Sequence, residues 1–100
     1  MNGRFRFTPE AEAQLAEIID FIAADSEDAA RRVLNGIHEA LDTLAEMPQI
    51  GHAREDLTER RLKFWGIYSY LIVYDPASSP LSVIAILRGA RDVEQILKNR

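Results

Sequence analysis

The sequence predicts an α+β fold in which a short N-terminal strand and an antiparallel helical hairpin pack on a small antiparallel β-sheet. Apolar residues recur at helical spacing through the first half of the chain, and apolar runs separated by turn residues fill the second half. The chain has 100 residues, of which 47% are hydrophobic and 28% charged. That is enough for one hydrophobic core, so we expect a single domain over residues 1–100.

The chain is expected to open with a strand and then a helix. Residues 4–7 read Arg-Phe-Arg-Phe, an alternation that is typical of a short strand. Thr8 and Pro9 then suit the N-cap and the first position of a helix. A helix over residues 9–24 follows from apolar residues at helical spacing: Ala11, Leu15, Ile18, Ile19 and Ile22.

A second helix is expected to begin after Ser26, whose hydroxyl can cap it. Its apolar stripe comprises Ala30, Val33, Leu34, Ile37, Leu41 and Leu44. Asn35-Gly36 is a hairpin signal, but its flanks have helical period, so it is interpreted as a weak point inside the helix. Pro48 lies just past the helix end. Because only two or three residues separate the helices, they should run antiparallel.

The second half is expected to form a loop followed by a meander. Residues 49–59 are polar and without period, which indicates the loop. Apolar and polar residues alternate over 61–65, Gly66 permits a turn, and 68–74 form an apolar run typical of a central strand. The remaining expected elements are a turn over 75–80, a strand over 81–88 and a short closing helix over 92–98.

Charge and composition exclude several functional classes. The net charge is −4, and residues 1–50 carry ten acidic residues against four arginines. General nucleic-acid binding is therefore disfavoured, because phosphate neutralisation supplies most of that affinity. The chain has no cysteine, which excludes disulfides, thiolate zinc sites and thiol catalysis. It has no signal peptide or apolar stretch of membrane-spanning length, which predicts a cytoplasmic protein that does not bind membranes.

The sequence offers no conventional catalytic or metal-binding motif. A Gly-x-Ser-x-Gly sequence is absent, and the two histidines, His38 and His52, lie in a helix and a loop. His52 with Glu55 and Asp56 matches no zinc or calcium spacing. No glycine-rich phosphate loop is present. We therefore expect no metal, no cofactor and no catalytic residue set.

One group of basic residues remains as a candidate site. Arg61 and Lys63 share a strand face on which Trp65 follows, and Arg88 and Arg91 come from the next strand and its exit. Neighbouring antiparallel strands would bring these cations within reach of one another. They would then bind phosphates or acidic side chains of a partner, or stabilise the transition state of metal-free RNA cleavage. Alternatively, they form a charged outer sheet face that prevents aggregation.

Four segments, in order along the chain, carry a resemblance to a known family. They are Phe-Thr-Pro-Glu-Ala-Glu-Ala-Gln-Leu at 7–15, Met-Pro-Gln-Ile-Gly at 47–51, Tyr-Leu-Ile-Val-Tyr at 70–74 and Leu-Arg-Gly-Ala-Arg-Asp at 87–92. Together they resemble the ParE/RelE superfamily of bacterial type II toxins. The resemblance implies the same fold, a helical hairpin on a small antiparallel sheet.

The superfamily has two branches, and the residues favour the ParE-like one. RelE-like members cleave mRNA on the ribosome with strand basic residues, a later arginine and a C-terminal tyrosine. Arg61 and Lys63 fall near the first basic set, and Arg91 fits the later arginine. However, Leu71 stands where the strand arginine belongs, and the tail over 92–100 has no tyrosine. Catalytic residues that act together cannot be lost singly without losing most of the nuclease activity. The resemblance therefore implies a binding poison rather than an enzyme.

The ParE-like resemblance implies two protein partners. One is DNA gyrase, which the toxin would trap on cleaved DNA, with Arg61, Lys63, Arg88 and Arg91 as candidate target-binding residues. The other is a ParD-like antitoxin with a ribbon-helix-helix DNA-binding head, whose tail would wrap the toxin in a hetero-oligomer. Phe21 and Trp65 are candidates for antitoxin binding, and operator DNA would be reached only through the antitoxin.

Two alternatives stay open at this point. A ribosome-dependent mRNA endoribonuclease with an altered catalytic set would require Arg61, Lys63 and Arg91 to converge on one concave surface. A non-toxic member would bind its antitoxin and help it to repress the operon.

Overall fold

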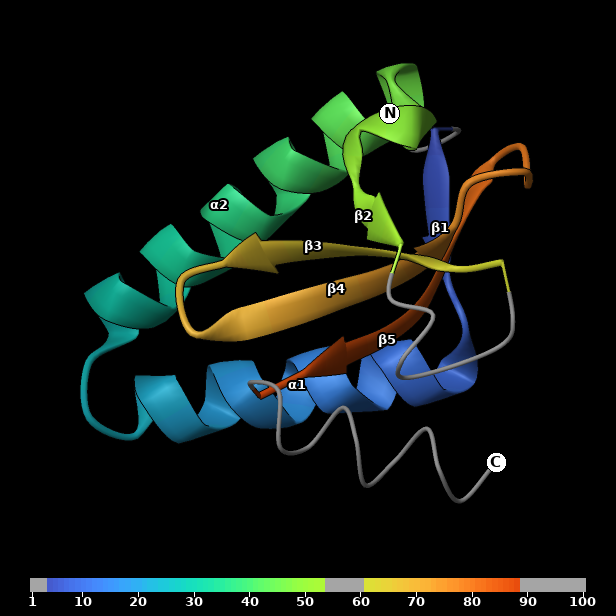
Figure 1. Ribbon diagram of the computed structural model, residues 1–100. Coiled ribbons are helices and arrows are strands. Elements are labelled where there is room, and N and C mark those ends of the chain that lie inside the picture. The colour runs from blue at the N-terminus through green and yellow to red at the C-terminus, as the bar shows by residue number, and fades with distance from the viewer. Residues whose placement is uncertain (1–3, 54–60, 89–100) are drawn as a thin grey trace.

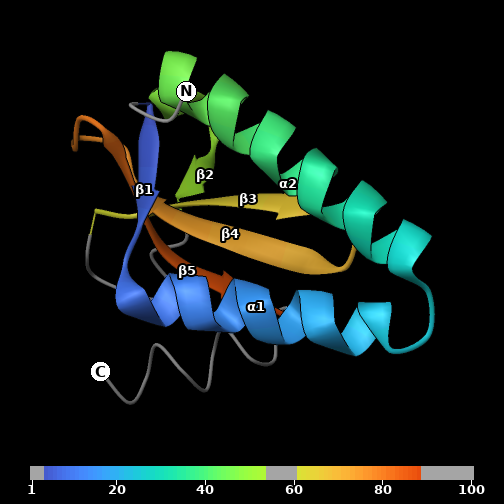
Figure 2. The ribbon, with the colours of Figure 1, turned by 180° about the vertical axis from the view of Figure 1, so that it is seen from behind.

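The computed structural model describes residues 4–53 and 61–88, which form one layer of helices on one sheet (Figure 1). The helices are α1 (Pro9–Ala23) and α2 (Glu27–Glu46), followed by a single 3-10 turn, η1 (Pro48–Ile50). The strands are β1 (Phe5–Phe7), β2 (His52–Ala53), β3 (Lys63–Ile67), β4 (Tyr70–Asp75) and β5 (Leu81–Leu87). Figure 2, seen from behind, shows both helices on the same side of the sheet. The predicted closing helix over 92–98 lies outside the described residues.

Both helices begin where the sequence predicts. The Thr8 hydroxyl accepts a hydrogen bond from the Ala11 N–H at 3.1 Å, and the Ser26 hydroxyl accepts one from the Ala29 N–H at 3.1 Å. Each cap satisfies an N–H that has no partner within the helix. The α2 helix runs unbroken through Asn35-Gly36, as its apolar period indicates.

The sheet has the order β1-β5-β4-β3-β2, so the last described strand lies inside the sheet, between β1 and β4. The pairs β2–β3, β3–β4 and β4–β5 are antiparallel, whereas β1 pairs with β5 in parallel. The sheet is therefore mixed rather than wholly antiparallel. In addition, β2 is a two-residue strand within the segment that was predicted to be a loop.

The turn between β3 and β4 lies two residues later than predicted. Gly66 is inside β3, opposite Leu71, and Ile67 pairs with Tyr70. The turn therefore consists of Tyr68 and Ser69, and Tyr68 has a φ of 55°. The central strand begins at Tyr70 and not at Tyr68, because a two-residue hairpin turn with a positive φ reverses the chain there.

Both faces of the sheet are apolar. The face beneath the helices contributes Ile72, Tyr74, Leu81, Val83 and Ile86 to a core shared with α1 and α2. The opposite face holds a second cluster of buried residues, Leu62, Phe64, Val73, Ala85 and Leu87. A bulge at Ile84, which has no partner on β4, places both Val83 and Ile86 toward the helices.

The part of β5 that extends beyond β1 is hydrogen-bonded by the side chains of Thr8, the N-cap of α1, and Gln14 within α1. β1 pairs with β5 only over Leu81 to Val83. Beyond that point the Thr8 hydroxyl donates to the Ile84 carbonyl at 3.1 Å, and the Ile86 N–H donates to Gln14 Oε1 at 2.9 Å. Two backbone groups that would otherwise be open to another strand are thus satisfied within the chain.

Candidate functional site

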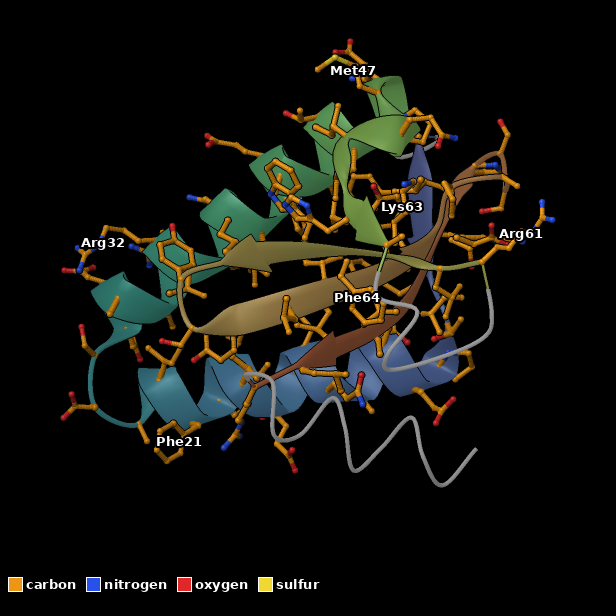
Figure 3. All side chains as sticks on the ribbon, in the orientation of Figure 1. Phe21, Arg32, Met47, Arg61, Lys63 and Phe64 are labelled. Atoms are coloured by element: carbon orange, nitrogen blue, oxygen red, sulfur yellow. The ribbon has the colours of Figure 1, made fainter. Side chains whose placement is uncertain are left out.

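Of the basic residues predicted to form one site, the three that the structure describes are divided between opposite ends of the sheet. Lys63 begins β3 opposite Tyr74, and its Nζ donates to the Gly51 carbonyl at 3.4 Å. Arg61 is exposed two residues before it. Arg88 follows the far end of β5, where Leu87 pairs with Leu71. Figure 3 shows Arg61 and Lys63 together at one end and Phe21, the neighbour of Arg88, at the other.

The expectation that adjacent strands gather these cations is wrong for Arg88. The strand beside β3 is β4, and β5 lies one strand further away. The meander order predicts this arrangement, since consecutive strands pair with each other. Arg91 lies outside the described residues. The interpretation as a charged outer sheet face is also wrong for Lys63, because Lys63 alternates with Phe64 and lies on the helix side with Trp65.

Arg88 and Phe21, which were assigned to different partners, form one contact. The Arg88 guanidinium carbon lies 5.6 Å from the centre of the Phe21 ring, a cation–π distance. Phe21 is 70% exposed in the last turns of α1. Beside it is a shallow depression whose described lining is Phe21, Ile22, Ala24 and Asp25. The structure therefore presents an exposed aromatic ring and a cation together on one surface.

Trp65 has a more internal position than expected for an interface residue. One side of its indole packs against the helix-side core. The His52 ring is stacked parallel to it, with the ring centres 6.2 Å apart. Trp65 is half-buried and so contributes to the fold, while the exposed His52 covers it at the sheet edge.

Three exposed apolar residues and one arginine were not singled out from the sequence. Met47 is 50% exposed, Ile50 37% and Tyr68 62%. Met47 precedes η1 and Ile50 is its last residue, and Ile50 fell within the segment that was predicted to be a polar loop. Tyr68 was assigned to a buried strand, and only the position of the turn reveals its exposure. Arg32 was one of several charges on an amphipathic helix, with nothing in the pattern to distinguish it.

Tyr74 joins the central strand to the segment after α2. Its hydroxyl donates to the Pro48 carbonyl at 2.7 Å and accepts from the Gly51 N–H at 3.0 Å. The side chain is fully buried. Burial raises the pKa of Tyr74, and the hydrogen bond from Gly51 opposes that rise. This tyrosine therefore acts as a structural link and not as a surface acid or base.

Within residues 4–53 and 61–88, no group of three histidine, aspartate or glutamate side chains is placed to hold a metal ion. None of the helices in these ranges is long and apolar enough to cross a membrane. The features that remain are exposed aromatic and basic side chains, which suit binding to a macromolecule.

Comparison with known proteins decides the family. The family model described as the ParE toxin of the type II toxin-antitoxin system parDE matches residues 5–93. This chain belongs to the ParE toxin family. The chain is 33% identical over 94 residues to "Putative toxin Y4kP" of Sinorhizobium fredii. The alignment covers 94% of this chain and 96% of that protein.

A solved structure supports the ParE fold independently. The structure titled "Chromosomal ParDE TA system from P. aeruginosa" superposes with a TM-score of 0.67 at 17% sequence identity. The match covers 86% of this chain and 95% of the other. The predicted α+β fold of a helical hairpin on a small sheet is thereby confirmed, as is the family resemblance stated from the sequence.

Proposed function

We propose that this ParE-family toxin stops growth by binding DNA gyrase and trapping it on cleaved DNA, and that a ParD-like antitoxin neutralises it by direct binding. One observation favours a binding poison over a nuclease: the basic residues Lys63 and Arg88 lie far apart. Lys63 and Arg88 are at opposite ends of the sheet and on strands that do not touch.

Metal-free RNA cleavage needs several donors aimed at one phosphate, because they must stabilise the charge that develops there. In the described residues, Lys63 is turned toward the Gly51 carbonyl and Arg88 lies over an aromatic ring. Leu71, at the position of the nuclease arginine, packs against the outer apolar cluster. These three positions support binding rather than cleavage.

The surface of α1 supports a protein antitoxin of complementary charge. Its four charged residues are all acidic: Glu10, Glu12, Glu17 and Asp20. An antitoxin tail with basic and apolar residues would complement this surface, with Phe21 and Trp65 as candidate contacts. The ribbon-helix-helix head of that antitoxin would bind operator DNA, so the toxin reaches DNA only through the hetero-oligomer.

The first test is pulse labelling in cells, minutes after induction of this chain alone. Thymidine incorporation should fall before methionine incorporation, because a trapped gyrase stops replication first. An earlier fall in methionine incorporation would identify the ribosome as the target and refute gyrase poisoning. If neither falls, the chain is not toxic in that host and the antitoxin-binding co-repressor is the better description. Co-expression of the neighbouring antitoxin gene is the control and should restore growth.

A further inference from the structure

One end of the molecule carries a group of exposed aromatic and basic side chains from four different elements. We call it the hairpin-end surface and define it as Phe21, Arg32, Tyr68 and Arg88. The α1–α2 connection and the β3–β4 turn lie at this same end (Figure 1). The Tyr68 hydroxyl donates to the Arg32 carbonyl at 3.4 Å, and Arg88 follows β5 beside the same end of β4. Figure 3 shows Phe21 and Arg32 projecting there.

The fold gains little stability from the side chain of Tyr68. Its φ of 55° lies in the left-handed region that favours glycine, so the backbone is strained by holding a bulky residue there. Tyr68 is 62% exposed, so its burial offsets little of that strain, and its hydrogen bond to the Arg32 carbonyl is long at 3.4 Å. The presence of a tyrosine at this turn is therefore poorly explained by the stability of the fold and well explained by contact with another molecule.

The two arginines define the chemistry of that molecule. Arg31 forms an ion pair with Asp28 at 3.3 Å, but its neighbour Arg32 has no carboxylate within ion-pair distance among the described residues. Arg88 is likewise placed over the Phe21 ring instead of a carboxylate. Arginines beside exposed aromatic rings are the composition of protein–protein hot spots. They fit a segment with a carboxylate next to an apolar side chain.

A nucleic acid fits this end less well than a protein does. Asp25, Glu27 and Asp28 occupy the α1–α2 connection and the start of α2, within the same end of the molecule. A polyanion would bring many phosphates near these carboxylates, whereas a protein segment brings only the one or two carboxylates that the arginines neutralise.

We propose that the hairpin-end surface is where the toxin docks on its cellular target, through an acidic and apolar segment of a protein. The proposal deepens the proposed function, since gyrase is the target named there. The surface itself does not depend on that identity, and the two can be tested separately.

The first experiment measures growth arrest after induction of three variants. Tyr68→Gly removes the ring while giving the turn the residue that its φ favours, so a loss of function does not come from unfolding. Arg32→Glu reverses the unpaired charge. Arg31→Glu is the matched control, because it makes the same change on the adjacent exposed residue. Circular dichroism and thermal unfolding of the purified proteins establish that each variant is folded.

We expect Tyr68→Gly and Arg32→Glu to relieve the arrest and Arg31→Glu to retain it. Full arrest by both surface variants would overturn the proposal, as would a wild-type chain that arrests nothing. Equal relief by Arg32→Glu and Arg31→Glu would also overturn it, since the effect would then be general to charge on α2.

The second experiment measures binding of the same proteins to purified DNA gyrase subunits and to a labelled DNA duplex. We expect gyrase binding to weaken at least about tenfold in Tyr68→Gly and Arg32→Glu, as for hot-spot residues. If wild type fails to bind gyrase while the two variants still relieve arrest, gyrase is the wrong target but the docking surface stands. Duplex binding that depends on Arg32 would overturn the assignment to a protein partner.

Discussion

Gly51 and Gly36 each face a tyrosine hydroxyl, and the burial of that tyrosine decides what the glycine contributes. A Cβ added at Gly51 would collide with the Tyr74 hydroxyl, and one added at Gly36 would collide with the Tyr68 hydroxyl. Tyr74 is fully buried and held by two hydrogen bonds, so it has no space to move. Tyr68 is largely exposed and can rotate into solvent.

We therefore expect opposite signs for two identical substitutions. Gly51→Ala should lower the free energy of unfolding by about 1–3 kcal/mol, the usual cost of overpacking. Gly36→Ala should raise it by up to about 1 kcal/mol, because alanine is the better helix former and Gly36 lies inside α2. Urea unfolding of both variants checks this. Equal destabilisation of the two would show that Tyr68 is as fixed as Tyr74.

Tyr74 should make the fold sensitive to alkali. Its pKa in the folded chain is raised above the usual 10.0, so between that value and its folded pKa only the unfolded chain releases the proton. The unfolded state then binds fewer protons, and the free energy of unfolding falls as the pH rises above 10.0. Below that pH the contribution is complete.

The measurement is urea unfolding at neutral and alkaline pH for wild type and Tyr74→Phe. The variant should be less stable at neutral pH by about 1–3 kcal/mol, because the Pro48 carbonyl and the Gly51 N–H lose their partner. It should also lose less stability on going to alkaline pH. An identical alkaline loss in both proteins would remove Tyr74 as the cause.

At the scale of elements, a side chain of α1 takes the place of a neighbouring strand beside the end of β5: Gln14 Oε1 accepts the hydrogen bond of the Ile86 N–H. Gln14→Leu removes the acceptor of the Ile86 N–H and leaves a partly buried donor unpaired. We expect a loss of about 1–3 kcal/mol in the free energy of unfolding. Hydrogen exchange should show faster exchange of the Ile86 amide. Gln14→Glu keeps an acceptor oxygen and should restore protection of that amide; if it does not, the contact is one of packing alone.

The elements that the sequence predicts well are those fixed by local chemistry. Thr8-Pro9 and Ser26 cap the two helices as expected, and the apolar period carries α2 through Asn35-Gly36. The β3–β4 turn was misplaced because Gly66 is the conventional turn residue, whereas the chain turns at Tyr68 with a positive φ. The parallel pairing of β1 with β5 joins residues far apart in sequence, and no local pattern encodes it.

The candidate site was harder to predict than the fold. Phe21 and Arg88 were both identified, but their contact depends on how α1 crosses β5. Arg88 was grouped with Lys63 because both lie on strands of one meander, although β4 separates those strands. Arg32 and Tyr68 were missed, since exposure on a helix face or at a turn depends on what packs beside it.

At the scale of the whole molecule, the sheet supports two apolar clusters, and each should matter about equally. Leu41 lies in the helix-side core and Phe64 in the outer cluster, and both are at most 2% exposed. We expect Leu41→Ala to cost about 2–5 kcal/mol and Phe64→Ala about 3–5 kcal/mol. Chemical denaturation measures both losses. A small loss for Phe64→Ala would show that the outer cluster contributes little to the cooperative fold.

The position of β5 inside the sheet, between β1 and β4, has a consequence for synthesis. A ribosome makes both helices before it makes the strand that lies between β1 and β4. Until residues 81–87 are free of the ribosome, β1 has no partner and the apolar face of α1 has no sheet beneath it. Translation at about 5–20 residues per second leaves that interval open for seconds. The described fold is therefore complete only when almost the whole described chain has been released, and a ribosome that stops before β5 leaves the sheet without the strand between β1 and β4.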